Sequence, residues 1–541
     1  MTTEMDNMDM HASTKALMNP LVLNLVFSYM DAPTLKSARS VCTLWADLGA
    51  AFLGEQVTVT FRTEHCCRKK TSKSSKELAS LHPKLARSIL LIMFPSPCGW
   101  VSLPKNLTTN LPQISNHIVI LDVMMISKFI PTLEQMWRTH HFPNLGLLTL
   151  TVILIKVDHR DTSEDEDDNS GHFIVDEDNH GHFAHSIDQD DEESDDAVEI
   201  VVVAPKIPQF LTLPNLRSLK IVVREQNENG QDDGISSICQ RLLNSAPNIL
   251  HVDIDASFYP DFTPCEKLKV LSYTFVQYFD DWAEADEFVD TSELAGMLDT
   301  CRNSLSGLSL SCPHDWENFA PGTFVLPSSP TLMVMHIEEM YPLGNFLHRV
   351  NLPNLTHVTF SGYNRNCMGL THIFKNFDLP HERITSLTVE VFYTYVEADV
   401  ETAAKIVRLF PSVKKFRLKL TICVDNDEDE PNVTEMLQSF ATWDLTSGSV
   451  EIESDKDTTD VMAVLRGLVV WKALSRTAVN FEATGSPTFV LDDEMEEILL
   501  YCRSLRWIKM SGFQMEEEDR DRFEEFIDEH ALQISLLNWV N

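Results

Sequence analysis

The chain of 541 residues lacks most of the signals that mark secreted, membrane and metal-binding proteins. It has no apolar run of about 18 residues, so we expect no transmembrane helix and no membrane partner. Its N-terminus is acidic and polar, without the basic and apolar regions of a secretion signal. The 11 Cys form no CxxC pair, which predicts reduced thiols and no zinc site. These absences favour a cytoplasmic and/or nuclear protein without a metal or cofactor.

Basic residues are also scarce. Lys and Arg number 43 against 81 Asp and Glu, and the net charge of −38 argues against a nucleic-acid ligand, because phosphates require a basic surface. Nearly half of the excess lies in residues 158–199, where 18 acidic residues stand against Arg160. This segment has few large aliphatic residues, so it is predicted to be a disordered insert. Ser163 and Ser194 precede acidic residues within it and are predicted phosphorylation sites.

Motifs for catalysis are missing as well. The sequence has no P-loop, no GxGxxG or GxSxG motif and no HExxH motif. Two carboxylate-rich stretches, 281–287 and 425–430, are interpreted as exposed loops, because isolated acidic runs are usually solvated. A glycosidase-like pair of carboxylates stays an alternative, since distances in space cannot be read from sequence. We therefore expect a binding protein rather than an enzyme.

What the chain does contain is a short sequence motif that repeats along it, and we call each copy a phrase. An apolar residue is followed by a second three positions later and a third two positions after that, as in Leu145, Leu148 and Leu150. The last two alternate with other residues, which predicts a short strand with one buried face. A Pro two positions before the phrase suits a strand entrance. The ten clear phrases begin at Leu145, Leu216, Ile249, Leu268, Leu305, Leu332, Leu355, Ile384, Val413 and Leu505, and weaker candidates begin at Leu85 and Ile114.

Segments with helical periodicity lie between the phrases, for example residues 294–301 and 400–410. The repeating unit is therefore helix, turn, strand and loop, and it resembles a leucine-rich repeat with irregular spacing. Because a short strand is stable only when stacked on its neighbours, we predict an irregular solenoid of parallel strands and helices over residues 81–541, interrupted by the insert. An unrelated α/β domain with several buried strands is the alternative.

The N-terminal part of the chain has a different pattern. Residues 16–54 are apolar at helical spacing, residues 1–15 are polar and predicted to be disordered, and residues 55–80 are predicted to be a linker. Pro20 suits a first helical turn, and Asp31 suits the start of a second helix. Two helices separated by a tight turn are therefore expected near the N-terminus.

Residues 18–48 resemble the F-box, a three-helix module that docks on the Skp adaptor of cullin–RING ubiquitin ligases. The string FSYMD from Phe27 and the string VCTLW from Val41 match the family at its spacing. Pro20 lies one position late, and Leu21 stands where the family has Glu. The resemblance implies that the adaptor-binding residues are Pro20, Leu21, Val26, Phe27, Met30, Leu35, Val41 and Trp45.

The expected fold class is α+α/β, with a short three-helix F-box-like module before the solenoid. This order resembles the substrate receptors of Skp–cullin–F-box ligases. It implies an adaptor bound by the module, a target protein bound by the repeats, and catalysis by other subunits. The acidic balance predicts a target that presents positive charge. One alternative is a leucine-rich-repeat scaffold outside any ligase, with residues 16–54 as its cap; another is an acidic chaperone for basic proteins that uses residues 158–199.

Overall fold

The computed structural model describes most of the chain outside the predicted acidic insert. The predicted disordered residues 1–15 (apart from Lys15), the insert at 158–199, Ser163 and Ser194 all lie outside the described residues. The described residues are 15, 17–62, 82–94, 111–154, 210–225, 234–275, 291–312, 326–340, 347–362, 369–393, 399–422, 433–454, 458–484 and 486–537.

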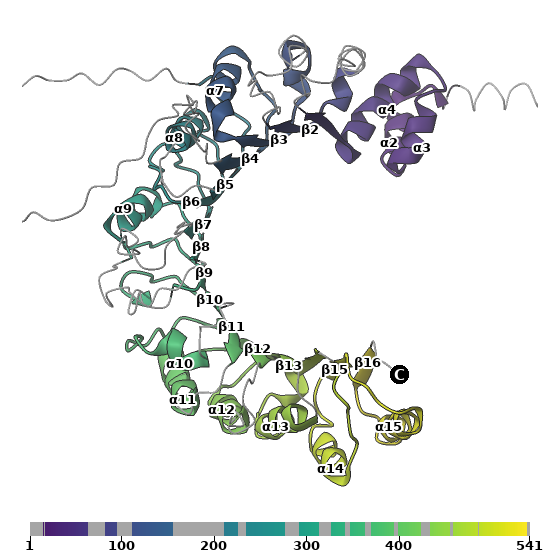
Figure 1. Cartoon of the computed structure of the whole chain (residues 1–541), viewed down its shortest axis with the longest axis vertical. Coiled ribbons are helices and arrows are strands. Elements are labelled where there is room, and N and C mark those ends of the chain that lie inside the picture. Colours follow the sequence, from purple (N-terminus) through teal and green to yellow (C-terminus); the bar gives the residue numbers. More distant parts are fainter. Residues whose placement is uncertain are drawn as a thin grey trace, which may run out of the picture.

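One parallel sheet runs through the molecule. Within the described residues it has 16 strands, and each pairs with its neighbours in sequence order. The sheet bends into an arc with the strands along its concave side (Figure 1). The prediction of a solenoid of short parallel strands is confirmed. The strands are β1 (Thr58–Arg62), β2 (Ser88–Met93), β3 (Ile120–Ile126), β4 (Leu147–Leu154), β5 (Ser218–Glu225), β6 (His251–Ala256), β7 (Val270–Phe275), β8 (Gly307–Ser311), β9 (Val334–Glu338), β10 (His357–Gly362), β11 (Ser386–Tyr393), β12 (Lys415–Ile422), β13 (Ser447–Ser454), β14 (Thr477–Ala483), β15 (Trp507–Ser511) and β16 (Ile534–Leu537).

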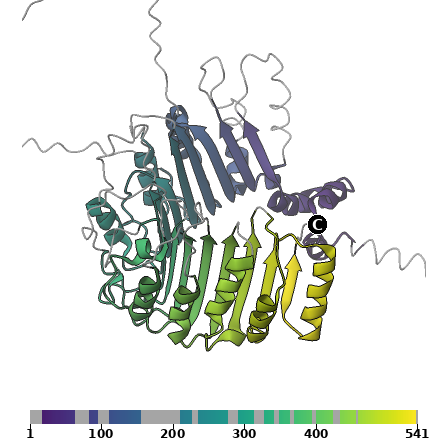
Figure 2. The same cartoon turned by 60° about the horizontal axis from the view of Figure 1, so that its bottom comes forward.

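Helices form the outer layer of the arc. Figure 2 shows neighbouring strands side by side, with the helices of the repeats on their outer side. The helices of this layer are α7 (Ile130–Thr139), α8 (Ile235–Ser245), α9 (Thr291–Cys301), α10 (Gly369–Phe374), α11 (Asp399–Leu409), α12 (Val433–Ser439), α13 (Thr458–Leu468), α14 (Asp493–Tyr501) and α15 (Glu517–Glu529). Three further helices, α2 (Pro20–Phe27), α3 (Ala32–Ala38) and α4 (Thr43–Gln56), lie together at the β1 end of the arc (Figure 1).

Each of the ten clear phrases forms a strand and the turn before it. Leu145 lies in the turn before β4, and Leu148 and Leu150 lie on the buried face of that strand. The residues between them face the concave side, which explains the alternating burial along the strand. The same frame holds for β5 to β12 and for β15, and the buried residues form one continuous core.

Asn side chains link the turns of successive repeats. Nδ2 of Asn215 donates a hydrogen bond to the carbonyl oxygen of Pro143 across 2.7 Å, and Asn248 donates to Pro214 across 2.9 Å. Such bonds satisfy turn carbonyls that no strand neighbour reaches. The Asn that follows Pro in these phrases is therefore part of the repeat signal, and the apolar pattern alone misses it.

The two weaker phrases were assigned in the wrong frame. Leu85 belongs to the 3₁₀ turn η1 (Pro83–Leu85) and packs on the N-terminal helices instead of the sheet core. Ile114 precedes a second 3₁₀ turn, η2 (Ser115–His117), which moves the strand four residues along the chain. The buried residues that take the phrase positions are Ala86, Ile89 and Leu91 for β2, and Ile118, Leu121 and Val123 for β3.

Strands β13 and β14 carry phrases whose middle residue is not a large apolar one. Gly448 takes that position in β13 and Thr477 takes it in β14, and the two are register partners. A Cβ on Gly448 would lie 2.6 Å from Oγ1 of Thr477, so the Thr side chain fills the space that the Gly leaves. Because neither Gly448 nor Thr477 is a large apolar residue, a search for the apolar motif misses both strands.

The predicted linker at 55–80 is wrong at its start. Helix α4 continues to Gln56, and β1 follows one residue later and pairs with β2. Val59 and Phe61 register with the core residues of β2, so β1 belongs to the solenoid. The Lys- and Ser-rich composition that suggested a linker belongs to residues 63–81, which lie outside the described residues.

Candidate docking face of the N-terminal helices

The N-terminal helices are built from local signals. Asn19 caps α2, because its side chain accepts a hydrogen bond from the Leu21 N–H at 2.9 Å, and Pro20 takes the first helical position. Asp31 caps α3 in the same way and accepts from the Thr34 N–H at 3.0 Å. The hydrogen bonds from Thr34 hold the pKa of the Asp31 carboxyl below its usual value. These caps set the directions of α2 and α3 on either side of a short turn.

A small core holds the three helices together. Its fully buried side chains include Leu23, Phe27 and Leu35. The ring of Phe27 meets the ring of Trp45 edge to face at 5.5 Å, and the Trp45 indole N–H donates to the carbonyl oxygen of Leu17 at 3.0 Å. Aromatic pairs of this geometry contribute beyond their buried area. Two of the predicted adaptor-binding residues, Phe27 and Leu35, are therefore interior residues of these helices.

The remaining predicted residues divide by exposure. Met30 and Trp45 are partly buried against the small core. Pro20, Leu21 and Val26 are exposed on α2, and Val41 is 63% exposed immediately before α4. The predicted set thus mixes side chains that support the helices with side chains that are free to meet a partner.

The exposed side of α2 is apolar along its whole length. Leu21 is 78% exposed, Leu25 63% and Tyr29 85%, and Met18 and Val22 are also exposed. Leu21, Val22 and Leu25 recur three or four positions apart, so they lie on one side of the helix, and Met18 and Tyr29 flank its two ends at the same spacing. No charged residue occurs between Leu17 and Met30. We call this set the α2 face. Leu25 and Tyr29 belong to this face but not to the predicted site, although both lie at helical spacing from Leu21 and Val22.

Ion pairs join α4 to the first repeats. Nζ of Lys84 lies 2.6 Å from Oδ2 of Asp47, and Arg87 lies 2.6 Å from Glu55. The hydrogen bond from Lys84 holds the pKa of the Asp47 carboxyl below its usual value, with a smaller opposing effect of burial. The N-terminal helices are therefore held directly against the start of the solenoid.

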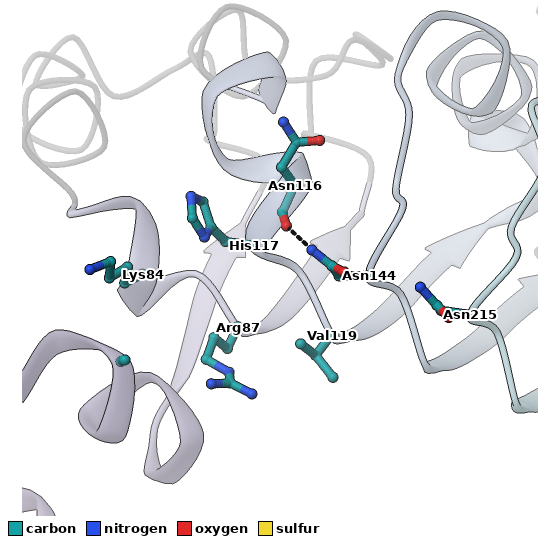
Figure 3. Close-up of a pocket in the computed structure, with 8 residues that line it drawn as sticks. Lys84, Arg87, Asn116, His117, Val119, Asn144 and Asn215 are labelled. Atoms are coloured by element: carbon teal, nitrogen blue, oxygen red, sulfur yellow. Dashed lines mark hydrogen bonds between the residues drawn. The ribbon is translucent and has the colours of Figure 1, made fainter. Parts of the chain in front are cut away.

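An open groove of about 370 Å³ lies beside this junction. The groove is lined by the basic side chains of Lys84, Arg87 and His117 (Figure 3). The rest of its lining is Asn116, Asn144 and Asn215 with the apolar residues Ala51 and Val119. Asn144 donates across it to the carbonyl oxygen of Asn116 at 2.5 Å, the bond drawn in Figure 3. Its Lys and Arg are already paired with carboxylates of α4, so the groove offers little free positive charge. We interpret it as part of the junction.

The concave face carries polar side chains through the middle of the arc. His336 on β9 lies between Ser309 on β8 and Ser361 on β10, with ring nitrogens 3.3 Å and 2.7 Å from the two hydroxyl oxygens. These contacts fix the imidazole and supply no carboxylate to activate it, as a catalytic triad requires. Among the described residues no cluster of His, Cys, Asp and Glu could hold a metal ion, and no helix has the length and apolar composition needed to span a membrane.

Comparison with known proteins adds little to this picture. No family model and no curated protein matches the chain. Among solved structures, one similar chain is a structural-genomics target from Bacteroides fragilis, with 14% identity and a TM-score of 0.22. The match covers 61% of this chain and 66% of that one, just under two thirds of its length. A likeness this weak carries no argument about function.

Proposed function

We propose that this chain is the substrate-recognition subunit of a Skp–cullin–F-box-type ubiquitin ligase. In this proposal the α2 face binds the Skp adaptor, the concave side of the solenoid binds the target protein, and the cullin–RING subunits carry out ubiquitin transfer in the cytoplasm and/or nucleus. The observation that carries the proposal is the α2 face itself. It is an uncharged row of exposed aliphatic and aromatic residues, as expected at the centre of a protein interface.

The alternative is a repeat scaffold outside any ligase, with α2 to α4 as a cap. A terminal cap needs a polar outer side, because nothing stacks on it. Leu21, Leu25 and Tyr29 place apolar side chains on that outer side instead, and soluble monomers rarely expose such rows without a partner. This contrast favours a docking module over a cap.

The short connection between the N-terminal helices and the solenoid supports a receptor in which these two parts keep a fixed relative orientation. Helix α4 passes into β1 through Val57 alone, and Lys84 and Arg87 pair with its carboxylates. An adaptor on the α2 face would therefore hold the concave side at a constant angle to the rest of the ligase. Such positioning is the contribution that a receptor without catalytic groups can make to transfer.

The test is co-purification of the full chain with the Skp adaptor. Val41→Glu and Leu21→Glu each place a charge at an apolar interface without disturbing buried residues, so both are expected to abolish recovery of the adaptor. Val350→Glu is the matched control, since Val350 is 71% exposed in the solenoid, and it should retain the adaptor. Failure of the wild-type chain to recover any adaptor would reject the receptor and favour the scaffold.

A further inference from the structure

An apolar patch lies on the concave side of β2 to β4. The concave positions of these strands hold Leu90 and Ile92, then Ile120 and Met124, then Leu147 and Ile153, and all are at least partly exposed; Asp122 and the hydroxyl residues Ser88, Thr149 and Thr151 lie between them. Several equivalent positions of later strands hold hydroxyl residues, such as Ser272 and Thr274 of β7 and Ser309 and Ser311 of β8, while Val270 of β7 and Val334 of β9 are exposed in the first row. The aliphatic side chains are thus most concentrated on β2 to β4, near the upper end of the arc in Figure 1.

A carboxylate lies two strands beyond this patch along the same register row. Met124 of β3 aligns with Thr151 of β4, Val222 of β5 and Asp255 of β6. Oδ1 of Asp255 is buried and has no hydrogen-bond partner among the described residues. Burial raises the pKa of the Asp255 carboxyl, and the neighbouring Asp253 raises it further. The fold therefore holds a partly desolvated, incompletely bonded carboxylate at the end of an apolar surface.

The two cations that attract Asp255 offset its burial only in part. Nζ of Lys220 is bonded to Oδ2 of Asp253 at 2.5 Å. Arg224 is exposed on β5 and attracts Asp255 only weakly, without an ion pair to it in the described part of the chain. A desolvated carboxylate without a partner is unfavourable, and a cation brought by a ligand removes that cost.

We propose that the concave side of β2 to β6 binds an extended segment of a partner protein, with aliphatic side chains on the β2–β4 patch and a Lys or Arg on Asp255. The assignment deepens the proposed receptor function and rests on it, since it names the class of target segment. Met124 and Asp255 are three strand spacings apart, about 14 Å, which an extended chain crosses in about four residues. The recognised segment therefore combines aliphatic residues with a basic residue about four positions away.

The probe is a random peptide library of about 12 residues displayed on phage, long enough in extended form to cross about eight strands. Selection on the full wild-type chain should enrich peptides that carry Lys or Arg about four positions from aliphatic residues. Asp255→Asn should remove the preference for Lys or Arg and weaken binding of the enriched peptides about thirtyfold. Met124→Ser should remove the aliphatic preference. Asp444→Asn, an exposed Asp near the far end of the arc, should change neither.

Stability provides a second readout. Asp255→Asn removes a desolvated charge, so the variant should unfold at the same or a higher urea concentration than the wild type, and lost binding cannot then be attributed to unfolding. A clear loss of stability would mean that Asp255 is already satisfied within the chain and would overturn the assignment. Selection without a Lys or Arg preference, or no selection above a plain-resin control, would overturn it as well.

Adaptor binding is scored separately through Val41→Glu, so the two proposals can fail independently. If the chain selects these peptides but does not bind the adaptor, the peptide-binding surface is supported and the ligase function is rejected. If the chain binds the adaptor but selects other peptides, the ligase function is supported and the peptide-binding surface is rejected.

Discussion

Gly54 of α4 and the carbonyl oxygen of Lys84 are so close that a Cβ on Gly54 would lie 2.4 Å from that oxygen. Because Gly54 has no side chain, helix α4 can pack closely on the first turn of the solenoid. The ion pairs of Asp47 and Glu55 form at the same contact. A Gly in a helix interior usually lowers stability, so its presence at this contact is explained by close packing. The junction, and with it the orientation of the α2 face, depends on this contact.

Gly54→Ala is expected to lower the free energy of unfolding by about 1–3 kcal/mol, because backbone on the opposite side cannot move aside easily. Urea unfolding of the full chain measures the effect. Gly296→Ala in α9 is the matched control, since a Cβ there meets nothing within 4 Å, and it should raise stability by up to about 1 kcal/mol. Equal effects from the two variants would show that α4 does not pack closely on η1.

Phe27→Ala should destabilise the N-terminal helices by about 3–5 kcal/mol, because the ring is fully buried against Trp45 and Phe52. Leu21→Ala should change stability by less than about 0.5 kcal/mol, because that side chain is exposed. Amide hydrogen exchange in α2 to α4 reports both. Fast exchange in the Leu21 variant would place that residue in the core and contradict the division between interior and docking residues.

Asn248→Ala should cost about 0.5–1.5 kcal/mol, because the Pro214 carbonyl loses its donor and Nζ of the exposed Lys267 loses an acceptor. Asn244→Ala serves as the control, since that side chain only accepts from Gln240 on the exposed side of α8, and its loss should be smaller. Urea midpoints compare the two variants. A larger loss of stability in the Asn244 variant would show that the Asn248 hydrogen bond does not stabilise the stacking of the repeats.

Asp399, the first residue of α11, gives a pH-dependent prediction. It is buried and accepts hydrogen bonds from the Leu370 N–H at 3.2 Å and from the Thr371 N–H and hydroxyl, both at 2.7 Å. Burial raises the pKa of its carboxyl, and the hydrogen bonds from Thr371 and Leu370 oppose this only in part. The folded state therefore binds the proton more tightly than the unfolded state does.

Its contribution to stability is complete below the unfolded-state pKa near 3.8 and is lost as the pH rises through the folded-state value. Asp399→Asn cannot ionise, so its stability relative to wild type should increase between about pH 4 and about pH 7. Asp444→Asn should show almost no trend over this range, because Lys414 lowers the pKa of that exposed carboxyl below 3.8 and its effect on stability changes only below about pH 4. Urea unfolding at both pH values measures the difference, and parallel trends would contradict the assignment.

The apolar spacing of the sequence was enough to predict ten strands, because each phrase places one residue in a turn and two on a buried face. It failed where the buried position holds an unusual residue. Gly448 and Thr477 share one volume across two strands, and the turn at Pro83 shifts the frame of β2. Both depend on neighbours about 30 residues away or on local turn geometry, which a short pattern does not contain.

The candidate site divides in the same way. The sequence by itself determined that residues 18–48 form an apolar helical segment and that a parallel repeat domain follows it. Only the tertiary structure separated Phe27, which packs inward, from Leu21 and Val41, which face outward, because helical spacing does not say which side meets the core. Only it placed Asp255 in one register row with Met124 of β3, since stacking of repeats brings distant strands into register.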